Sequence, residues 1–331
     1  MYANDFAAKD AHLRVHMIGH GSDTKKSDAF LLEYQGAFVM IDGGMEECDA
    51  TIRYLLDLRA HILSDRPELI EDPSCRLRLR VMISHCHRDH LGALITHIFP
   101  SPYIEVEALY MPPNGELDET YGLSGDLKYR SSLSEALQTY QPQAQVTHLP
   151  FGEENRLVLT MSEKSPDSPV ITICPPWKNA ASPERVALIC KHLKDGEKNP
   201  NIATMVTNNN SMWVHVRHGE NTFLFTGDTV KKNKPMGYEM VEEMIGVYSD
   251  VLGQVDVVKY VHHGFKRDAA AEAMLSLSPK YLILTTVLAT ADAVIRESYP
   301  EHDVKLLNCA TQTYVFTSDG KNLTVSPECC E

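Results

Sequence analysis

Three histidines and one aspartate fall within six positions of the chain, at His85, His87, Asp89 and His90. Neutral imidazole and carboxylate groups are ordinary ligands for zinc, manganese and iron. A structural zinc site normally uses cysteines and closes its tetrahedron, whereas this set favours an open, catalytic centre. On an extended loop His85 and His87 can both face one ion, and Asp89 and His90 can face a second.

The elements around this cluster predict where it lies. Residues 77–83 are predicted to form a strand that enters a core, and residues 91–99 carry apolar side chains at helical spacing. The cluster therefore occupies a loop between the C-terminal end of a strand and a helix, where α/β folds place their chemistry. A polar surface loop with exposed histidines is the alternative, but four ligand-type residues rarely coincide at this spacing.

The rest of the chain alternates between predicted strands and helices, with no low-complexity linker. The first half has further predicted strands at 12–18, 29–34, 37–41, 107–111, 146–149, 156–161 and 170–174. It also has three further predicted helices: one begins after Asp49, one spans 124–140 and one spans 184–193. The second half has strands at 211–216, 222–225, 255–261, 281–285, 305–307, 313–317 and 323–325, and a helix at 240–252. Because the halves repeat one pattern, we predict a single domain over residues 12–325, an N-terminal extension of 1–11 and a tail of 326–331.

Composition and charge exclude several classes of function. The 331 residues are 43% hydrophobic and 23% charged, as in globular proteins, and the net charge is −14. This charge should repel nucleic acid and anionic membranes, so stable duplex binding is not expected. The eight cysteines lack the paired spacing of a zinc ribbon, and we find no secretory signal or membrane span. We therefore expect reduced thiols and a cytoplasmic protein, with Cys86 in the wall of the pocket.

Two features together resemble a known superfamily. The cluster matches the His-x-His-x-Asp-His signature of the metallo-β-lactamase fold superfamily, and the hairpin at 29–41 ends at Asp42-Gly43-Gly44, which is how such domains open. The resemblance implies an α/β fold, a four-layer αββα sandwich with the metal site at one edge between two mixed sheets. It also implies that Asp42 orients the metal loop from behind the ligands.

The same resemblance implies ligands outside the cluster. Asp228 follows a strand and would bridge both metals, since one carboxylate can span ions roughly 3.5–4 Å apart. A histidine after the strand at 255–261 completes the second metal; we favour His263, with His262 as the alternative ligand or a substrate contact. The implied cofactor is two divalent ions, with zinc favoured over manganese and iron. The metal ligands are then His85, His87, Asp89, His90, Asp228, His263 and His262.

One ligand that most members of the superfamily carry is missing here. It is a histidine between the cluster and the bridging aspartate; His148 ends a predicted strand but lies too early. The segment Asn208-Asn209-Asn210-Ser211 stands there instead. An asparagine oxygen can bind a hard metal and its amide can donate to a phosphate, while a polar turn is the alternative.

This segment extends the resemblance to one branch of the superfamily. Residues 208–211, 226–228 and 256–264 resemble the metallo-β-lactamase domain of the competence DNA-uptake channel family, without its channel-forming membrane part. The resemblance covers most of residues 12–325. Because members of this branch are usually nucleases or phosphodiesterases, it implies phosphodiester chemistry.

We therefore predict a metal-dependent hydrolase of a small anionic phosphodiester or nucleotide. Asp89 and Asp228 would position a metal-activated hydroxide, and nearby basic and amide side chains would hold the substrate. The expected substrate-binding residues are Asn208, Asn210, Ser211, Lys259 and Lys266, with Arg88, Lys231, Lys232, Lys234 and Arg267 near the rim. A lactone or thioester hydrolase and a catalytically weak metal-binding protein are the alternatives, and the oligomeric state is left open.

Overall fold

The computed structural model describes residues 1–21, 26–113, 124–176, 207–230, 232–233, 238–264, 270–287 and 291–327. Their strands form two large sheets and a two-stranded ribbon of β11 (Lys232–Asn233) and β12 (Tyr238–Glu239). The predicted helix at 184–193 lies outside the described residues.

The first sheet has eight strands in the order β17-β16-β1-β2-β3-β4-β5-β6. The pairs from β3 to β6 are parallel, and the pairs from β17 to β3 are antiparallel. Its strands are β1 (Leu13–Met17), β2 (Phe30–Tyr34), β3 (Ala37–Ile41), β4 (Leu77–Met82), β5 (Ile104–Met111), β6 (Gln145–His148), β16 (Tyr314–Ser318) and β17 (Leu323–Pro327).

The second sheet has seven strands in the order β15-β14-β13-β10-β9-β8-β7. The pairs from β10 to β15 are parallel, and the pairs from β7 to β10 are antiparallel. Its strands are β7 (Leu157–Thr160), β8 (Val170–Cys174), β9 (Trp213–His218), β10 (Asn221–Phe225), β13 (Val257–Lys259), β14 (Tyr281–Leu284) and β15 (Lys305–Asn308). Both sheets are therefore mixed.

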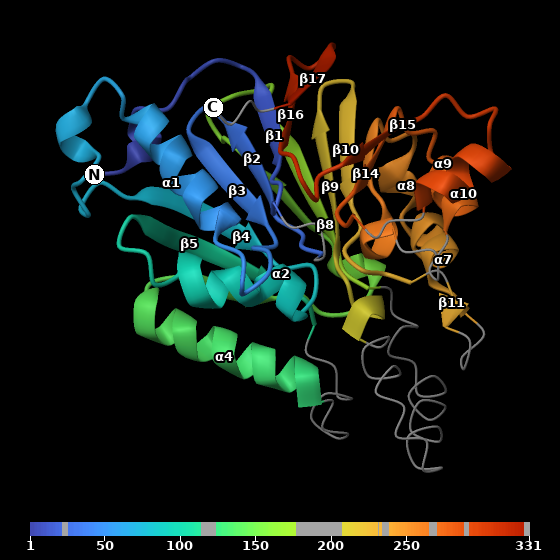
Figure 1. Cartoon of the computed structure of the whole chain (residues 1–331), viewed down its shortest axis with the longest axis horizontal. Helices are drawn as coiled ribbons and strands as arrows, with labels where there is room; N and C mark the ends of the chain where they lie inside the picture. The colour runs from blue at the N-terminus through green and yellow to red at the C-terminus, as the bar shows by residue number, and fades with distance from the viewer. Residues whose placement is uncertain are drawn as a thin grey trace.

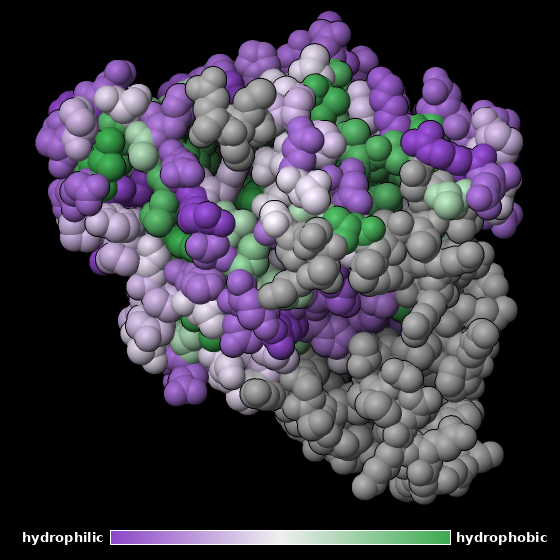
Figure 2. Space-filling view, in the orientation of Figure 1, coloured by the Kyte–Doolittle hydropathy of each residue, from purple (hydrophilic) through white to green (hydrophobic). Residues whose placement is uncertain are grey.

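Helices cover the outer faces of the two sheets (Figure 1). The helices beside the first sheet are α1 (Ala50–Ile62), α2 (Arg88–Ala93) and α4 (Ser124–Tyr140), and those beside the second are α7 (Met240–Val247), α8 (Ser249–Leu252), α9 (Ala271–Leu275) and α10 (Ala291–Ser298). The result is the predicted αββα sandwich, which is confirmed. The face seen in this view is mostly hydrophilic, with separate hydrophobic areas (Figure 2).

Apolar side chains fill each space between the layers. β4 shows the pattern: Leu77 and Leu79 pack with the helices of the first sheet, whereas Met82 packs in the cluster between the sheets. A third cluster joins the second sheet to its helices, with Leu282 of β14 and Met244 of α7 among its members. Burial of alternate strand residues on two faces explains why these segments form inner layers.

Some predicted bounds differ from the structure. The helix predicted at 240–252 is two helices, α7 and α8, because the chain bends at Tyr248, whose hydroxyl donates to Pro175 O over 2.6 Å. The strand predicted at 255–261 shortens to Val257–Lys259, since the backbone turns sharply at residues 261–264. No helix in the described part of the chain is long and apolar enough to cross a bilayer.

Candidate metal centre

The candidate centre forms at one edge of the sandwich, where strands of both sheets end. Residues 85–90 follow β4 of the first sheet. Asp228 follows β10 and residues 262–263 follow β13; these strands are parallel neighbours, so their carboxyl ends lie side by side. The Met212 backbone N–H donates to Ser84 O over 2.8 Å, which joins the two sheets at this point.

Asp228 lies in the middle of the centre and is fully buried. Its Oδ1 is 3.2 Å from His90 Nε2, and its Oδ2 is 3.0 Å from His263 Nε2. Its Oδ2 is also 3.9 Å from His85 Nε2 and 3.7 Å from His262 Nε2. One carboxylate therefore faces four imidazole nitrogens from two sheets, an arrangement that suits a bridging ligand.

Asp89, His90 and His263 form what we call the inner group. Asp89 Oδ2 is 3.3 Å from His263 Nε2, and the three side chains are 9%, 0% and 0% exposed. His90 Nδ1 lies 2.8 Å from Asp42 Oδ2, and His263 Nδ1 lies 2.9 Å from Asp28 Oδ1. A carboxylate that accepts from Nδ1–H leaves the Nε2 lone pair for a metal, and it makes the imidazole a stronger ligand.

Asp42 is fixed behind the metal loop by several contacts. Its Oδ1 accepts the Ser84 backbone N–H over 2.7 Å, and its Oδ2 accepts the Ser84 hydroxyl over 2.7 Å. Its φ of 55° lies in the left-handed region, which a non-glycine residue rarely adopts. The structure thus places Asp42 where it can orient His90, as the resemblance implies.

His85, His87 and His262 form the outer group. His85 Nε2 and His87 Nδ1 are 3.0 Å apart, so both can face one point. Besides Asp228, their neighbours include neutral groups: His85 Nδ1 lies 3.1 Å from Ser84 Oγ, and His262 Nε2 lies 3.5 Å from Asn208 Nδ2. The His262 side chain is 17% exposed, so the outer group lies nearer to solvent than the inner group.

Burial and neighbouring charges prepare the outer group and Asp228 for a cation. Burial holds the pKa of His85 well below its usual value and lowers the pKa of His87 to about 4. Burial opposes ionisation of Asp228, but the imidazoles of His263 and His90 outweigh it and hold its pKa well below the usual value. Neutral imidazole and ionised carboxylate are the states in which each group binds a metal.

In the inner group the carboxylates favour protonated imidazole when no cation is bound. Burial lowers the pKa of His263, but Asp228 and Asp28 outweigh it and raise the pKa to about 9. Asp228 and Asp42 likewise overcome burial and raise the pKa of His90 well above its usual value. A proton and a metal ion therefore compete for the same nitrogens.

Several observations test whether these residues fit divalent ions. His90 Nε2 and Asp228 Oδ2 are buried and make no well-aligned hydrogen bond among the described residues; each faces another ligand-type atom instead, Asp228 Oδ1 at 3.2 Å and His263 Nε2 at 3.0 Å. Ligand atoms of Asp28, His90, Asp228 and His263 lie within 4.8 Å of one another. Buried polar atoms without a hydrogen bond are rare in proteins. Imidazole nitrogen and carboxylate oxygen suit zinc, manganese and iron, so the residues fit such ions.

Two expected substrate contacts must be corrected. The Lys259 side chain is 0% exposed, and its Nζ lies 2.6 Å from Asp28 Oδ2 and donates to Gly227 O over 2.6 Å. Ser211 is also buried, and its Oγ accepts the Asp228 backbone N–H over 3.1 Å. Because both side chains are enclosed and used within the protein, they hold the site together rather than meet a substrate.

The asparagine segment lies beside the centre. Asn208 Oδ1 is buried without a hydrogen-bond partner among the described residues, while its Nδ2 faces His262. Asn209 Oδ1 accepts the Val230 backbone N–H over 3.3 Å and so supports the Asp228 loop. Asn210 is 7% exposed. Asn208 is therefore the member of this segment that is placed to meet a metal or a substrate.

The sequence prediction missed Asp28, Lys26 and Thr285. Lys26 Nζ lies 2.8 Å from Asp89 Oδ2, and Thr285 Oγ1 lies 2.8 Å from His263 Nδ1. The available signal is a charged residue, Asp28, directly before the apolar run 29–32 that leads into β2. Charged side chains are rarely buried without a partner, so a charged residue beside a buried strand indicates a partner elsewhere in the chain.

Other predicted residues lie apart from the centre or outside the described part of the chain. Lys231, Lys234, Lys266 and Arg267 lie outside it, and the side chain of Lys232 is not described. Arg88 forms ion pairs with Glu46 and Glu47.

Two further predictions concern His148 and Cys86. His148 ends β6, the edge strand of the first sheet, and is exposed there, so it is no substitute for the missing ligand. Cys86 is 0% exposed and packs in the hydrophobic cluster with Leu91 and Ile83. The expected position of this thiol in the pocket wall is therefore corrected to the core under the first sheet.

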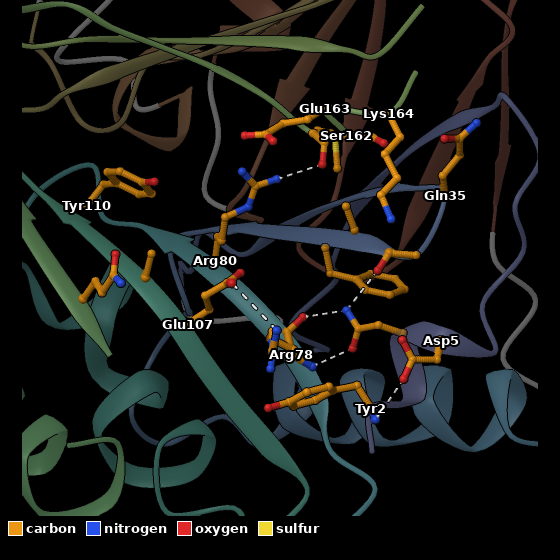
Figure 3. Close-up of a pocket in the computed structure, with 17 residues that line it drawn as sticks. Tyr2, Asp5, Gln35, Arg78, Arg80, Glu107, Tyr110, Ser162, Glu163 and Lys164 are labelled. Atoms are coloured by element: carbon orange, nitrogen blue, oxygen red, sulfur yellow. Dashed lines mark hydrogen bonds and ion pairs between the residues drawn. The ribbon is translucent and has the colours of Figure 1, made fainter. Parts of the chain in front are cut away.

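A cavity of about 600 Å³ lies elsewhere, near the beginning of β4 (Figure 3). Arg78 and Arg80 line it, but the structure already uses both cations. The Arg78 guanidinium lies 3.5 Å from the centroid of the Tyr2 ring and pairs with Glu105, and Arg80 donates to Thr160 O over 3.2 Å. This cavity is thus a poorer candidate for chemistry than the Asp228 centre.

Comparison with known proteins gives likeness at the level of fold. No protein-family model and no curated sequence matches the chain. Similar solved structures include the metallo-β-lactamase fold protein YhfI from Bacillus subtilis, with a TM-score of 0.47 and 12% identity over 93% of this chain and 100% of that one.

Two further structures are similar to the same extent. Tm1679, described as a metal-dependent hydrolase of the β-lactamase superfamily, has a TM-score of 0.47 and 13% identity over 90% of this chain and 96% of that one. Unliganded yeast PDE1 has a TM-score of 0.49 and 10% identity over 90% of this chain and 98% of that one. The fold of this chain is therefore argued from its own two sheets and helices, and its chemistry from its own residues.

Proposed function

We propose that this protein is a metal-dependent hydrolase that cleaves a small phosphodiester or nucleotide. The observation that carries the proposal is the convergence of the inner and outer groups on the buried Asp228 carboxylate. Two bound divalent ions, with zinc favoured, would supply a water that is deprotonated near neutral pH and would neutralise developing negative charge. The residues of the chain would hold the ions, orient the water and the substrate, and exclude other solvent from the centre.

The inner and outer groups would have different roles in the reaction. The inner group is enclosed and held by carboxylates, so it is suited to retaining an ion through turnover. The outer group borders solvent through His262, so a substrate can approach it. Asp89, at the boundary, has a carboxylate that could accept the proton of the attacking water and pass it to the leaving oxygen, which departs as an alcohol when the phosphorus–oxygen bond breaks.

The class of substrate follows from the charges near the centre. Lys26 pairs with Asp89 at 2.8 Å but keeps 33% of its side chain exposed at the edge of the centre, and the Asn208 amide lies beside His262. Such donors suit a small anion. Because the net charge of the whole chain is −14, we propose that long duplexes bind weakly and that turnover is confined to small phosphodiesters or strand ends.

Metal analysis and a substrate panel test the proposal together. Metal-depleted protein is reloaded with zinc, manganese or iron, and its metal content is measured by mass spectrometry. Each form is then assayed on bis-p-nitrophenyl phosphate, nitrocefin, a lactone and a thioester. We expect up to two ions per chain and hydrolysis of the phosphodiester first. Preferred turnover of the lactone or thioester would refute the substrate class, and less than half an equivalent of metal would refute the metal centre.

A further inference from the structure

Asp28 and Lys259 form an ion pair beneath the inner group, and neither side chain is exposed to solvent. Lys259 Nζ lies 2.6 Å from Asp28 Oδ2, and the other oxygen of Asp28 lies 2.9 Å from His263 Nδ1. Both oxygens of Asp28 are thus turned towards protein groups. Asp28 is placed to hold a ligand rather than to be one.

Lys259 also contacts the loop that carries the bridging carboxylate. Its Nζ donates to Gly227 O over 2.6 Å and lies 3.4 Å from Asp228 Oδ1. Thr226 Oγ1 in turn donates to Lys259 O over 2.9 Å. One buried ammonium therefore ties together the segment before β2, the end of β10 and the end of β13.

The contact between Lys259 and the Gly227 carbonyl requires a glycine at position 227. Its φ is +56°, and an added Cβ would lie 2.7 Å from Ser211 Oγ, so a side chain here would push the loop away. The backbone conformation that presents Gly227 O to Lys259 therefore depends on glycine.

We propose that the Asp28–Lys259 pair is a positioning device that prepares His263 for a metal ion. Asp28 fixes Nδ1 of His263 as the donor and turns Nε2 towards Asp228, while Lys259 holds Asp28 in place through its 2.6 Å contact with Oδ2. The inference rests on the metal centre of the proposed function and adds two residues to it. Neither residue touches the substrate, because both are enclosed.

An alternative is that the pair only stabilises the fold. Removing one partner of a buried pair destabilises a protein, whereas replacing both partners by neutral residues of similar size is often tolerated. A fold-only role therefore predicts that the double replacement restores both the stability and the metal affinity of the wild type. A positioning role predicts that it restores stability but leaves metal affinity low, because His263 lacks its carboxylate.

The experiment compares Asp28→Asn, Lys259→Met and the double variant with wild type in metal-free form. Zinc affinity is measured by competition with a chromophoric chelator, cobalt loading is followed by its visible absorption, and melting is recorded without metal. We expect each single variant to lose about 10–100-fold in affinity at the tighter site. We expect the double variant to melt near wild type yet bind as weakly as Asp28→Asn, with an altered cobalt spectrum.

The control is Glu33→Gln, which alters a buried carboxylate 3.3 Å from His16 Nε2 in the first sheet, outside the centre. It should lower the melting temperature and leave metal affinity unchanged. If the single variants do not fold, the double variant, which removes both members of the pair, decides the question alone.

A double variant with wild-type zinc affinity and cobalt spectrum would overturn the inference, and so would a wild-type protein that binds no metal. A wild-type protein that binds metal but hydrolyses none of the substrates would refute the proposed function and leave this inference intact.

Discussion

The inner and outer groups share Asp228 but are built differently. The inner histidines are backed by two buried carboxylates, Asp42 and Asp28, at 2.8 and 2.9 Å. In the outer group, the Ser84 hydroxyl lies behind His85 at Nδ1, while the Asn208 amide meets His262 at the Nε2 that faces Asp228. A carboxylate behind an imidazole fixes its tautomer and strengthens it as a ligand, whereas neutral partners do so less. The comparison teaches that the two groups differ in the partners of their imidazoles, and we expect this difference to make one proposed metal site tighter than the other.

Replacing the shared residue should give the largest effect. Asp228→Ala removes the only carboxylate that faces both groups among the described residues, so both ions should be weakened. We expect kcat/KM on bis-p-nitrophenyl phosphate to fall at least about a thousandfold, roughly 4 kcal/mol of transition-state stabilisation.

A surface residue provides the matched control for that variant. Asp250→Ala removes a carboxylate of which 59% is exposed and which pairs with Arg156 at the surface, so it should change neither activity nor metal content. Normal metal content with full activity in Asp228→Ala would show that the bridging assignment is wrong.

Neighbouring histidines allow the two groups to be separated. His263→Ala should abolish binding of the tighter ion, because its Nε2 is enclosed beside Asp89 and Asp228. His262→Ala should weaken only the second, looser ion, by about tenfold. Stepwise zinc titration of both variants, with chelator competition, measures the two affinities. Equal losses at both ions in the two variants would contradict the division into groups.

Much of this arrangement could be predicted from the sequence, because it depends on local pattern. Alternating apolar residues place β4 as an inner strand, and the loop after it carries the cluster. Asp228 and His263 lie at strand ends as expected, because parallel neighbours end at the same edge. Their roles as metal ligands stay predictions.

The residues behind the ligands could not be predicted in the same way. Asp28 meets His263 across a separation of 235 residues, so no spacing in the sequence reveals the contact. Lys259 was interpreted as a substrate contact because a lysine is usually exposed, but Asp28 and the Gly227 carbonyl satisfy its charge in the interior. Burial of a charge is decided by such distant partners, which a local pattern does not contain.

The comparison can be sharpened by supplying the ligand that the outer group lacks. Asn208→His places an imidazole beside His262, where the Asn208 amide now lies 3.5 Å from Nε2. We expect the looser zinc affinity to rise about tenfold and the tighter one to stay unchanged. Asn208→Ala is the matched control and should weaken the looser site only slightly. If Asn208→His also raised the zinc affinity of the inner group, the two groups would not bind their ions independently.

The smallest effect is expected from Cys86→Ala, although Cys86 stands between two outer ligands in the sequence. Thiolate is a strong zinc ligand, so position alone would make Cys86 a candidate. Its side chain is instead buried in the apolar cluster that includes Leu91 and Ile83. Removing a buried sulfur should cost about 1 kcal/mol of unfolding free energy through a small cavity, and change kcat/KM by less than about threefold. Thermal melting and phosphodiesterase assays measure the two separately, with metal content as a third reading. A hundredfold loss of activity, or loss of either ion, would indicate that Cys86 is a metal ligand and belongs to the outer group.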